Sequence, residues 1–313
     1  MTDRTLRILF AARDDKWDEY RPYLTRALSE TGLEADLSRD HPAEEVDYIV
    51  HAPNGGLSDF SGFPRLRAVL SLWAGVEDIV GNDTLEVPLT RMVDPGLTEG
   101  MVEYVTGHVL RHHLGMDAQI HGLDGEWTGA APPLARDRKV TILGLGALGA
   151  ACADALSRLN FDVAGWSRSP KDLDGIATHH GEDGLAAALG HGEITVLLLP
   201  LTRATEGIVD AGRLALMPKG AVLLNPGRGG LVDEAALLDA LGTGQIAHAT
   251  LDTFRTEPLP KDHPFWTHPR VTVTPHIASA TRAPSASRAI VDNIARAERG
   301  QALENVVDRS AGY

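Results

Sequence analysis

Short apolar segments alternate with longer amphipathic segments along most of the 313 residues of the chain. The short segments have the length of buried strands, and the longer ones carry apolar residues at helical spacing, as residues 17–30 do. This alternation is typical of βαβ units arranged around a parallel sheet. The pattern therefore predicts an α/β fold.

The strand-like segments fall into two groups. The first group comprises residues 6–11, 46–51, 68–71 and 89–92, and the second comprises residues 139–143, 162–166, 194–199, 221–225, 248–251 and 271–274. The chain is also longer than the roughly 100–200 residues usual for one domain. We therefore expect two α/β domains.

A turn-forming cluster, Asp94-Pro95-Gly96, separates the two groups of strands and suits a hinge. A long helix is expected after it, from Thr98 as N-cap to about His121. A last helix, residues 284–299, lies beyond the final strand and has the length to return to the first domain. The expected domains are residues 1–96 with 284–313, and residues 97–283.

A glycine-rich turn, residues 144–149, joins the apolar strand at 139–143 to an alanine-rich helix. In a dinucleotide fold the first glycine permits a tight turn, the second lets a pyrophosphate approach, and the third lets helix and strand pack. The helix N-terminus offers N–H groups and a partial positive charge to the phosphates. The turn is a predicted dinucleotide site, formed by Gly144, Gly146, Ala147, Leu148 and Gly149.

The end of the next strand bears on which dinucleotide binds. An acidic residue there would bond the ribose 2′-hydroxyl of NAD, whereas an arginine accommodates the 2′-phosphate of NADP. This chain has Ser167-Arg168-Ser169 at that point and no acid before Asp172. A guanidinium forms paired hydrogen bonds with phosphate, and serine hydroxyls can add more. NADP(H) is favoured over NAD(H), although Arg168 could also be only a solvated loop residue.

Three residues with the chemistry of 2-oxo acid reduction follow three successive strand-like segments: Arg228, Glu257 and His276. The reaction needs a cation for the carboxylate and an acid for the new alkoxide, besides a hydride donor. A carboxylate bonded to one imidazole nitrogen fixes the tautomer and favours the protonated ring. Flanking glycines are expected to leave the Arg228 side chain exposed. Each residue alone has an ordinary structural explanation, but together they predict a hydride-transfer enzyme.

Composition narrows the possible partners. A net charge of −14 disfavours binding to nucleic acid and to anionic membranes. The single cysteine, Cys152, excludes an intrachain disulfide and is expected to pack in a helix. The N-terminus lacks a signal-peptide pattern, and no apolar run approaches the roughly 20 residues that span a bilayer. A soluble, cytoplasmic protein is expected.

The histidines outside the three-residue set are not expected to bind a metal. His108 and His112 are spaced as an i, i+4 pair and His113 follows, but no glutamate lies between them in the metalloprotease manner. No third ligand is evident, so no metal site is predicted. His179 and His180 are expected in a solvated loop.

The sequence resembles the D-isomer-specific 2-hydroxyacid dehydrogenases, and within them the glyoxylate/hydroxypyruvate reductase A branch. The resemblance is dense between about residues 98 and 283. The matching segments are the glycine turn and residues 198–202, 224–229, 251–254, 257–260, 264–271 and 275–278. It implies a Rossmann-type doubly wound parallel sheet in the nucleotide domain and a smaller flavodoxin-like α/β substrate domain, with the active site in a cleft.

The resemblance also implies roles for particular residues. Arg228 would orient the substrate, His276 would donate the proton with Glu257 as its partner, and Asp252 would lie near the nicotinamide. Further cofactor contacts would come from Leu199, Pro200, Thr205, Pro226 and Gly227. Backbone N–H groups of Gly75 and Val76, in the loop that begins at Trp73 and Ala74, would hold the substrate carboxylate. A homodimer is also expected from the family.

One residue departs from the family pattern. Trp73 stands where a small residue, often glycine, is usual. Its indole could narrow the substrate pocket or pack into the core of the first domain, so the size of the substrate stays open. Residues 51–56 follow a strand of the first domain and could also face the cleft.

The combined expectation is NADPH-dependent reduction of a small 2-oxo acid, resembling glyoxylate or hydroxypyruvate, to the 2-hydroxy acid. Two alternatives remain at this point. One is an NAD-dependent dehydrogenase of different specificity, acting on phosphoglycerate, lactate or formate. The other is a non-catalytic nucleotide sensor, for which an intact set of Arg228, Glu257 and His276 would be unnecessary.

Overall fold

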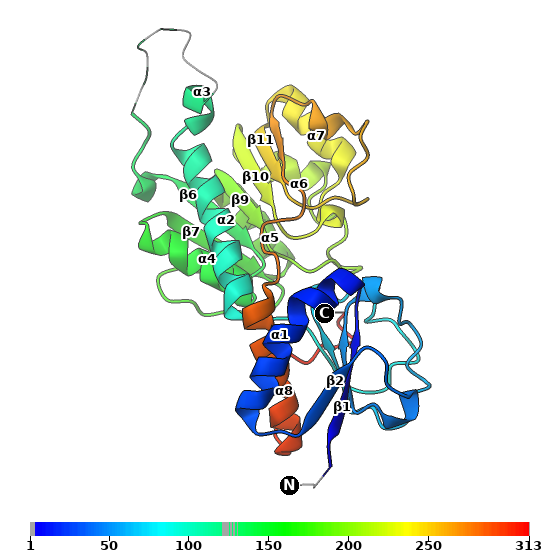
Figure 1. The fold of residues 1–313 in the computed structure, drawn as a ribbon. Coiled ribbons are helices and arrows are strands. Elements are labelled where there is room, and N and C mark those ends of the chain that lie inside the picture. The colour runs from blue at the N-terminus through cyan, green and yellow to red at the C-terminus, as the bar shows by residue number, and fades with distance from the viewer. Residues whose placement is uncertain (1–3, 121–124, 126, 128, 130, 313) are drawn as a thin grey trace. The chain divides into compact units, whose positions relative to one another are not determined.

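The computed structural model describes residues 4–120, 125, 127, 129 and 131–312. The chain divides into two compact units, Met1–Leu97 with Thr281–Tyr313, and Thr98–Ala280. Each unit is built around its own parallel sheet with helices packed on it (Figure 1). The predicted α/β fold with two parallel sheets is therefore confirmed.

The sheet of the first unit has the strand order of a flavodoxin-like fold. Its five strands lie in the order β2-β1-β3-β4-β5. Their bounds are β1 (Leu6–Ala11), β2 (Ala35–Ser38), β3 (Tyr48–His51), β4 (Ala68–Ser71) and β5 (Leu89–Thr90), with short 3₁₀ helices η1 (Ala43–Glu45) and η2 (Pro53–Gly55). Helices α1 (Asp14–Thr31) and α8 (Ala283–Glu298) lie side by side (Figure 1) and share one apolar core with β1, β3 and β4. The last helix thus completes the core of the first unit.

The sheet of the second unit has seven parallel strands in the order β12-β11-β10-β9-β6-β7-β8. The chain moves outward from β6 to β8 and then crosses to β9, which is the Rossmann arrangement. The strands are β6 (Lys139–Leu143), β7 (Asp162–Ser167), β8 (Ala177–His180), β9 (Ile194–Leu197), β10 (Ala221–Asn225), β11 (Ile246–Leu251) and β12 (Val271–Val273). The strand order reverses between β6 and β9, where such folds bind their ligands.

Helices cover both faces of this second sheet. Helices α2 (Pro95–His113) and α4 (Ala147–Arg158) bury one side with Val196 and Leu224 of the sheet. Helices α5 (Gly181–His191), α6 (Ala211–Leu216) and α7 (Glu234–Thr243) bury the other with Leu197 and Leu223. Successive strand residues point to opposite faces, so burial of both faces accounts for the continuous apolar runs. The remaining elements are α3 (Met116–Ile120), η3 (Ala135–Asp137), η4 (Gly229–Leu231) and η5 (Pro264–Trp266).

The long helix begins earlier than the sequence predicted. Helix α2 starts at Pro95, because the Asp94 carboxylate accepts hydrogen bonds from the N–H groups of Gly96 (3.1 Å) and Leu97 (3.2 Å). Asp94 therefore caps the helix, and the assignment of Thr98 as N-cap was wrong. The helix ends at His113, and α3 follows after a turn in which Gly115 has a φ of +63°. His121, the predicted end, lies outside the described residues.

Two strands at sheet edges were not predicted. In β2 every residue is partly exposed, and in β8 Ala177 and His180 are exposed, so neither strand has a clear apolar signal. The interpretation of His179 and His180 as loop residues was wrong, since both lie in β8. Cys152 is fully buried in α4, as predicted, and burial raises its thiol pKa to about 12. Among the described residues, every helix is too short or too polar to cross a membrane.

Two partly buried histidines, one on α2 and one on β11, pack against each other. The rings of His112 and His248 lie 4.9 Å apart, and each Nε2 bonds a threonine hydroxyl at 2.9 Å, on Thr250 and Thr272 respectively. The pKa of His112 is lowered to about 3, mainly by burial and then by the neighbouring His248 and Arg111. The pKa of His248 is lowered to about 4, mainly by burial and then by Arg111. Both rings are therefore uncharged in the folded protein at neutral pH.

This pair predicts a loss of stability in acid. Below the ordinary histidine pKa of about 6.5, these two histidines are protonated in the unfolded chain but not in the folded protein. The free energy of unfolding therefore decreases as the pH is lowered from about 6.5 to the depressed pKa values. His112→Gln removes one of the two groups. Between pH 7 and 4.5 its melting temperature is expected to fall less than that of the wild type, by roughly 5 °C. Gln in place of the exposed His180 is the control, and equal falls in all three proteins would contradict this account.

Candidate active site

Arg228, Glu257 and His276 lie in loops that follow three neighbouring strands, β10, β11 and β12. The register pairs Asn225 with Leu251 and Leu251 with Val273, so the three strands end at the same edge of the sheet. The carboxyl edge of a parallel sheet is where ligands bind in these folds. The structure therefore places the three predicted residues along one edge of the second unit.

His276 and Glu257 form a hydrogen-bonded pair. Nδ1 of His276 lies 2.7 Å from Oε2 of Glu257, with the two side chains 51% and 35% exposed. The other carboxylate oxygen, Oε1, accepts the N–H of Phe254 at 2.9 Å, which holds the carboxylate in place. Because a carboxylate accepts, Nδ1 carries the proton and donates it, and Nε2 is left to face a ligand. This is the arrangement expected of an oriented acid.

The Asp252 carboxylate fixes the loop that carries His276. Asp252 is fully buried, and its Oδ1 and Oδ2 accept the N–H groups of Ile277 and Ala278, each at 2.9 Å. Its backbone carbonyl accepts the N–H of His276 at 2.8 Å. The structure thus gives Asp252 a role that the sequence did not reveal, as the acceptor for three consecutive amides.

Buried glycines bring the Arg228 loop against the loop of Glu257. A Cβ on Gly229 would lie 2.0 Å from the backbone carbon of Phe254, so only glycine fits there. Arg228 itself is partly buried, and its Nη1 donates to the carbonyl of Gly227 at 2.7 Å. The expectation that the glycines leave the Arg228 side chain exposed was wrong. They permit two loops to touch, and this contact places the guanidinium.

The glycine turn after β6 has the three features of a dinucleotide cradle. Gly144 has a φ of +109° and packs against the backbone of Leu198, at the point where the strand order reverses. Gly149 packs against Gly144, where an added Cβ would lie 1.7 Å from its carbonyl oxygen. At Gly146 an added Cβ would meet nothing within 4 Å, so the N-terminus of α4 stays open to a ligand. The residues present fit a bound pyrophosphate.

In the loops after β7, β9 and β10, some predicted cofactor residues are exposed and others are buried or hold the loop in shape. Arg168 and Ser169 are exposed at the end of β7, whereas Ser167 is buried and its hydroxyl donates to the carbonyl of Ser169 at 2.7 Å. Ser167 therefore shapes the turn. After β9, the Thr205 hydroxyl donates to the carbonyl of Pro200 at 2.6 Å and closes the loop that begins at the buried Leu199. Pro226 and Gly227 are buried beneath the Arg228 loop.

The first unit carries the predicted carboxylate-binding loop directly after β4. Within the described part of the chain, the N–H groups of Ala74, Gly75 and Val76 donate to no protein acceptor. The Val76 side chain is buried in the core, which anchors the loop. Trp73 packs against the core of α1, α8 and β1, and also lines a hollow. Packing into the core of the first domain, one of the two explanations considered for its bulk, is therefore confirmed, and narrowing of the substrate pocket stays a prediction.

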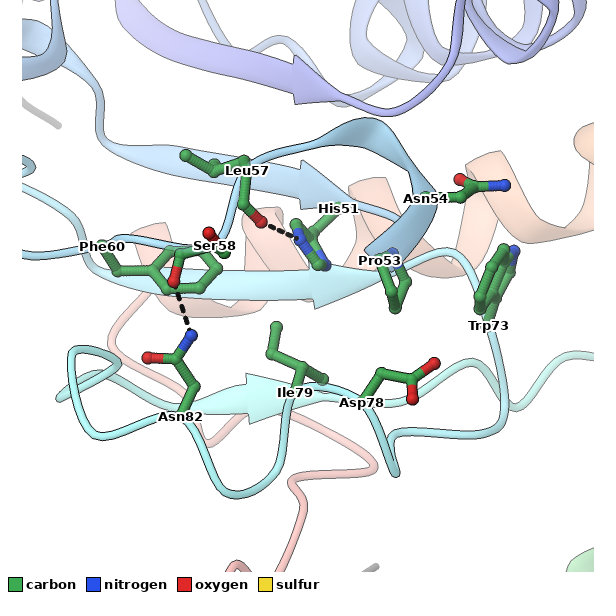
Figure 2. A pocket seen from close by; sticks show the side chains of 10 residues that line it. All are labelled: His51, Pro53, Asn54, Leu57, Ser58, Phe60, Trp73, Asp78, Ile79 and Asn82. Atoms are coloured by element: carbon green, nitrogen blue, oxygen red, sulfur yellow. Dashed lines mark hydrogen bonds between the residues drawn. The ribbon is translucent and has the colours of Figure 1, made fainter.

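Figure 2 shows this hollow of about 320 Å³ in the first unit. It is lined by His51, Pro53, Asn54, Leu57, Ser58, Phe60, Trp73, Asp78, Ile79 and Asn82. His51 is buried, its Nε2 lies 3.0 Å from the carbonyl oxygen of Leu57, and burial lowers the pKa of its ring. His51, Pro53 and Asn54 thus share a hollow with Trp73.

No metal site accompanies these features. Over residues 4–120 and 131–312, with the three described between them, no three His, Cys, Asp or Glu side chains are grouped to hold a metal ion. His108 stacks on Tyr104 with 4.4 Å between ring centroids, and His113 packs edge-on to Phe161. These histidines serve the packing of α2.

The chain matches the family model described as the NAD binding domain of D-isomer specific 2-hydroxyacid dehydrogenases over residues 106–278. It is 42% identical to glyoxylate/hydroxypyruvate reductase A of Serratia proteamaculans over 257 residues, which is 80% of this chain and 82% of the relative.

Solved structures match over nearly the full length. A D-isomer specific 2-hydroxyacid dehydrogenase from Xanthobacter autotrophicus, in complex with NADPH and MES, has a TM-score of 0.90 and 40% identity, covering 99% of this chain and 100% of that chain. An NADPH-dependent glyoxylate/hydroxypyruvate reductase from Sinorhizobium meliloti, with NADP and sulfate, has a TM-score of 0.83 and 34% identity, with 99% and 100% covered. The chain therefore belongs to the D-isomer specific 2-hydroxyacid dehydrogenases, a family of NAD(P)-dependent oxidoreductases, and the resemblance drawn from its motifs is confirmed.

Proposed function

We propose that the protein reduces a small 2-oxo acid of the glyoxylate or hydroxypyruvate kind to the 2-hydroxy acid with NADPH. The observation that carries the proposal is the 2.7 Å pair of His276 and Glu257, set at the same sheet edge as Arg228. The names of the reductase A relative and of the NADPH-dependent reductase support the substrate class. An oriented acid and a cation are the two protein groups that this reduction requires.

The second unit would hold the cofactor. The open N-terminus of α4 would receive the pyrophosphate, and the loops after β9 and β10 would line the rest of the site. These contacts come from Gly144, Gly146, Ala147, Leu148, Gly149, Leu199, Pro200, Thr205, Pro226, Gly227 and Asp252. When bound, the nicotinamide dinucleotide supplies the hydride. Asp252 acts here through the loop that it anchors, because both of its carboxylate oxygens accept amides of that loop.

Protein groups would handle the charge and the proton. Nε2 of His276 donates a proton to the substrate's carbonyl oxygen, while Glu257 keeps Nδ1 protonated and the ring oriented. Arg228 holds the carboxylate and polarises the carbonyl group. The unbonded N–H groups of Gly75 and Val76 bind the carboxylate, with Trp73 and Ala74 flanking them.

Preference for NADPH rests on the exposed turn after β7. Arg168 and Ser169 are exposed there and would bind the 2′-phosphate, and Ser167 shapes the turn. Two related structures contain NADPH or NADP, which supports this assignment.

Homodimerisation is also proposed. A partner subunit can cover three apolar side chains that are each at least 37% exposed, those of Leu114, Met116 and Ile120. Light scattering on the purified protein measures the oligomeric state.

The proposed function is tested by a panel of glyoxylate, hydroxypyruvate, pyruvate and larger 2-oxo acids with each cofactor, followed at 340 nm. With glyoxylate and hydroxypyruvate, the rate of NADPH oxidation is expected to exceed the rate of NADH oxidation by about tenfold or more. A tenfold preference for NADH would mean an NAD-dependent dehydrogenase. Tight NADPH binding with no turnover of any acid would mean a nucleotide sensor.

Replacing the proposed proton donor separates chemistry from binding. His276→Asn is expected to lower kcat by about 10²–10⁴-fold, because the alkoxide loses its acid, while the Kd for NADPH stays within about twofold. Steady-state kinetics and fluorescence titration measure the two quantities. His180→Asn, on the exposed edge strand, is the matched control. Full turnover in the His276 variant would remove that residue from its assigned role.

Replacing the proposed phosphate ligand tests the cofactor preference. Arg168→Ala is expected to raise the KM for NADPH by about tenfold or more and to leave the KM for NADH nearly unchanged, because only NADPH carries the 2′-phosphate. Arg158→Ala is the control, since this exposed arginine on α4 pairs with Asp154. An equal loss with both cofactors would show that Arg168 supports the fold and does not select the phosphate.

A further inference from the structure

His276 has a backbone conformation that side-chain-bearing residues rarely adopt. Its φ is +54°, in the left-handed region, which residues with a side chain keep only where the surrounding contacts enforce it. Asp252 receives three successive amides: its backbone carbonyl accepts the N–H of His276, and its carboxylate accepts those of Ile277 and Ala278. The N–H of His276 also lies 3.1 Å from the carbonyl oxygen of Thr274. The direction of the imidazole therefore depends on how firmly the Asp252 carboxylate is held.

A chain of two hydroxyl groups holds that carboxylate from outside the loop. The hydroxyl of Thr274 lies 2.6 Å from Oδ1 of Asp252, and the hydroxyl of Tyr104 lies 2.8 Å from Oγ1 of Thr274. Both carboxylate oxygens accept amide hydrogens, so the Thr274 hydrogen points at Asp252. Its oxygen must then accept the hydrogen of Tyr104, because each hydroxyl has only one. The hydrogen bonds run from Tyr104 through Thr274 to Asp252.

The two hydroxyl groups come from different layers of the second unit. Thr274 directly follows β12 in the segment that leads into His276, whereas Tyr104 lies on α2, 170 residues earlier in the chain. Burial raises the pKa of Tyr104, which keeps its hydroxyl hydrogen in place as a donor. The ring of His108 lies 4.4 Å from the tyrosine ring and restricts its movement. Helix α2 is thereby connected to the His276 loop by a directed pair of hydrogen bonds.

We propose that Tyr104 and Thr274 are positioning residues for the reaction, which hold Asp252 and so aim the imidazole of His276. This inference rests on the proposed function for its kinetic consequence. The two hydroxyl groups act on Asp252 and, through it, on the loop of His276. They act by holding the Asp252 carboxylate on the amides of Ile277 and Ala278, next to the backbone carbonyl that accepts the N–H of His276, so that the turn at His276 has a single conformation. A shift of about 1 Å at a reacting group can cost as much as 10²-fold in rate.

The test uses Thr274→Val, Thr274→Ser and Tyr104→Phe, with Thr272→Val as matched control. Thr272 lies in β12, two residues before Thr274, and its hydroxyl bonds His248 instead of Asp252. Thr274→Val removes both hydrogen bonds at almost constant volume, Tyr104→Phe removes one, and Thr274→Ser keeps both. The measurements are amide hydrogen exchange at residues 276–278, kcat and KM with glyoxylate, the Kd for NADPH, and the solvent isotope effect on kcat.

Thr274→Val is expected to speed amide exchange at residues 276–278 at least about tenfold and to lower kcat by about 10–100-fold. Tyr104→Phe should cause smaller changes in the same direction, and Thr274→Ser and Thr272→Val should resemble the wild type. KM and the Kd for NADPH should stay within about twofold, and the solvent isotope effect should rise because proton donation becomes slower.

Unchanged exchange at residues 276–278 in Thr274→Val would overturn the inference whatever the activity. So would an unchanged kcat in that variant when the wild type is active. A wild type that reduces no 2-oxo acid would instead overturn the proposed function, and the exchange data would still decide whether the hydroxyl chain holds the loop.

Discussion

One buried carboxylate, that of Asp252, is the constraint on which the arrangement of this site depends. An unpaired carboxylate is costly to bury, so this side chain is held by every donor that reaches it. Those donors are the amides of Ile277 and Ala278 and the hydroxyl of Thr274. In satisfying Asp252, the chain after β12 is forced into a tight left-handed turn at His276. The hydrogen bonds that satisfy the Asp252 carboxylate thus also fix the position of the His276 loop.

The close approach of loops supplies the second constraint. The parallel order of β10, β11 and β12 brings their carboxyl ends together, but only glycine lets the loops touch. Gly229 admits the backbone of Phe254, whose N–H in turn holds the carboxylate of Glu257. Gly144 likewise admits the backbone of Leu198 beside the dinucleotide turn. Cation, acid and cofactor cradle are therefore positioned by backbone contacts, which side-chain motion cannot easily disturb.

Much of the fold and the site was predictable from sequence because its signals are local. Buried strands such as β6 and β10 are continuous apolar runs, and the glycine turn lies directly between a strand and a helix. The edge strands β2 and β8 were missed because half-exposed residues give no apolar pattern. Asp94 was overlooked as the cap of α2 because it was assigned, together with Pro95 and Gly96, to a hinge. The position of Thr274, just before Pro275 and His276, could have indicated a role near the site. The sequence around Tyr104 gives no indication that it bonds Thr274, because the two residues are 170 positions apart.

The central claim is that His276 and Glu257 work as one acid. The most direct measurement is a double-mutant cycle on kcat/KM for glyoxylate, using His276→Asn, Glu257→Gln and the double variant. If Glu257 acts only through the imidazole, the double variant should lose no more activity than His276→Asn alone, within about twofold. If the two losses instead multiply, each residue acts separately, and the hydrogen-bonded pair is not the acid of the reaction.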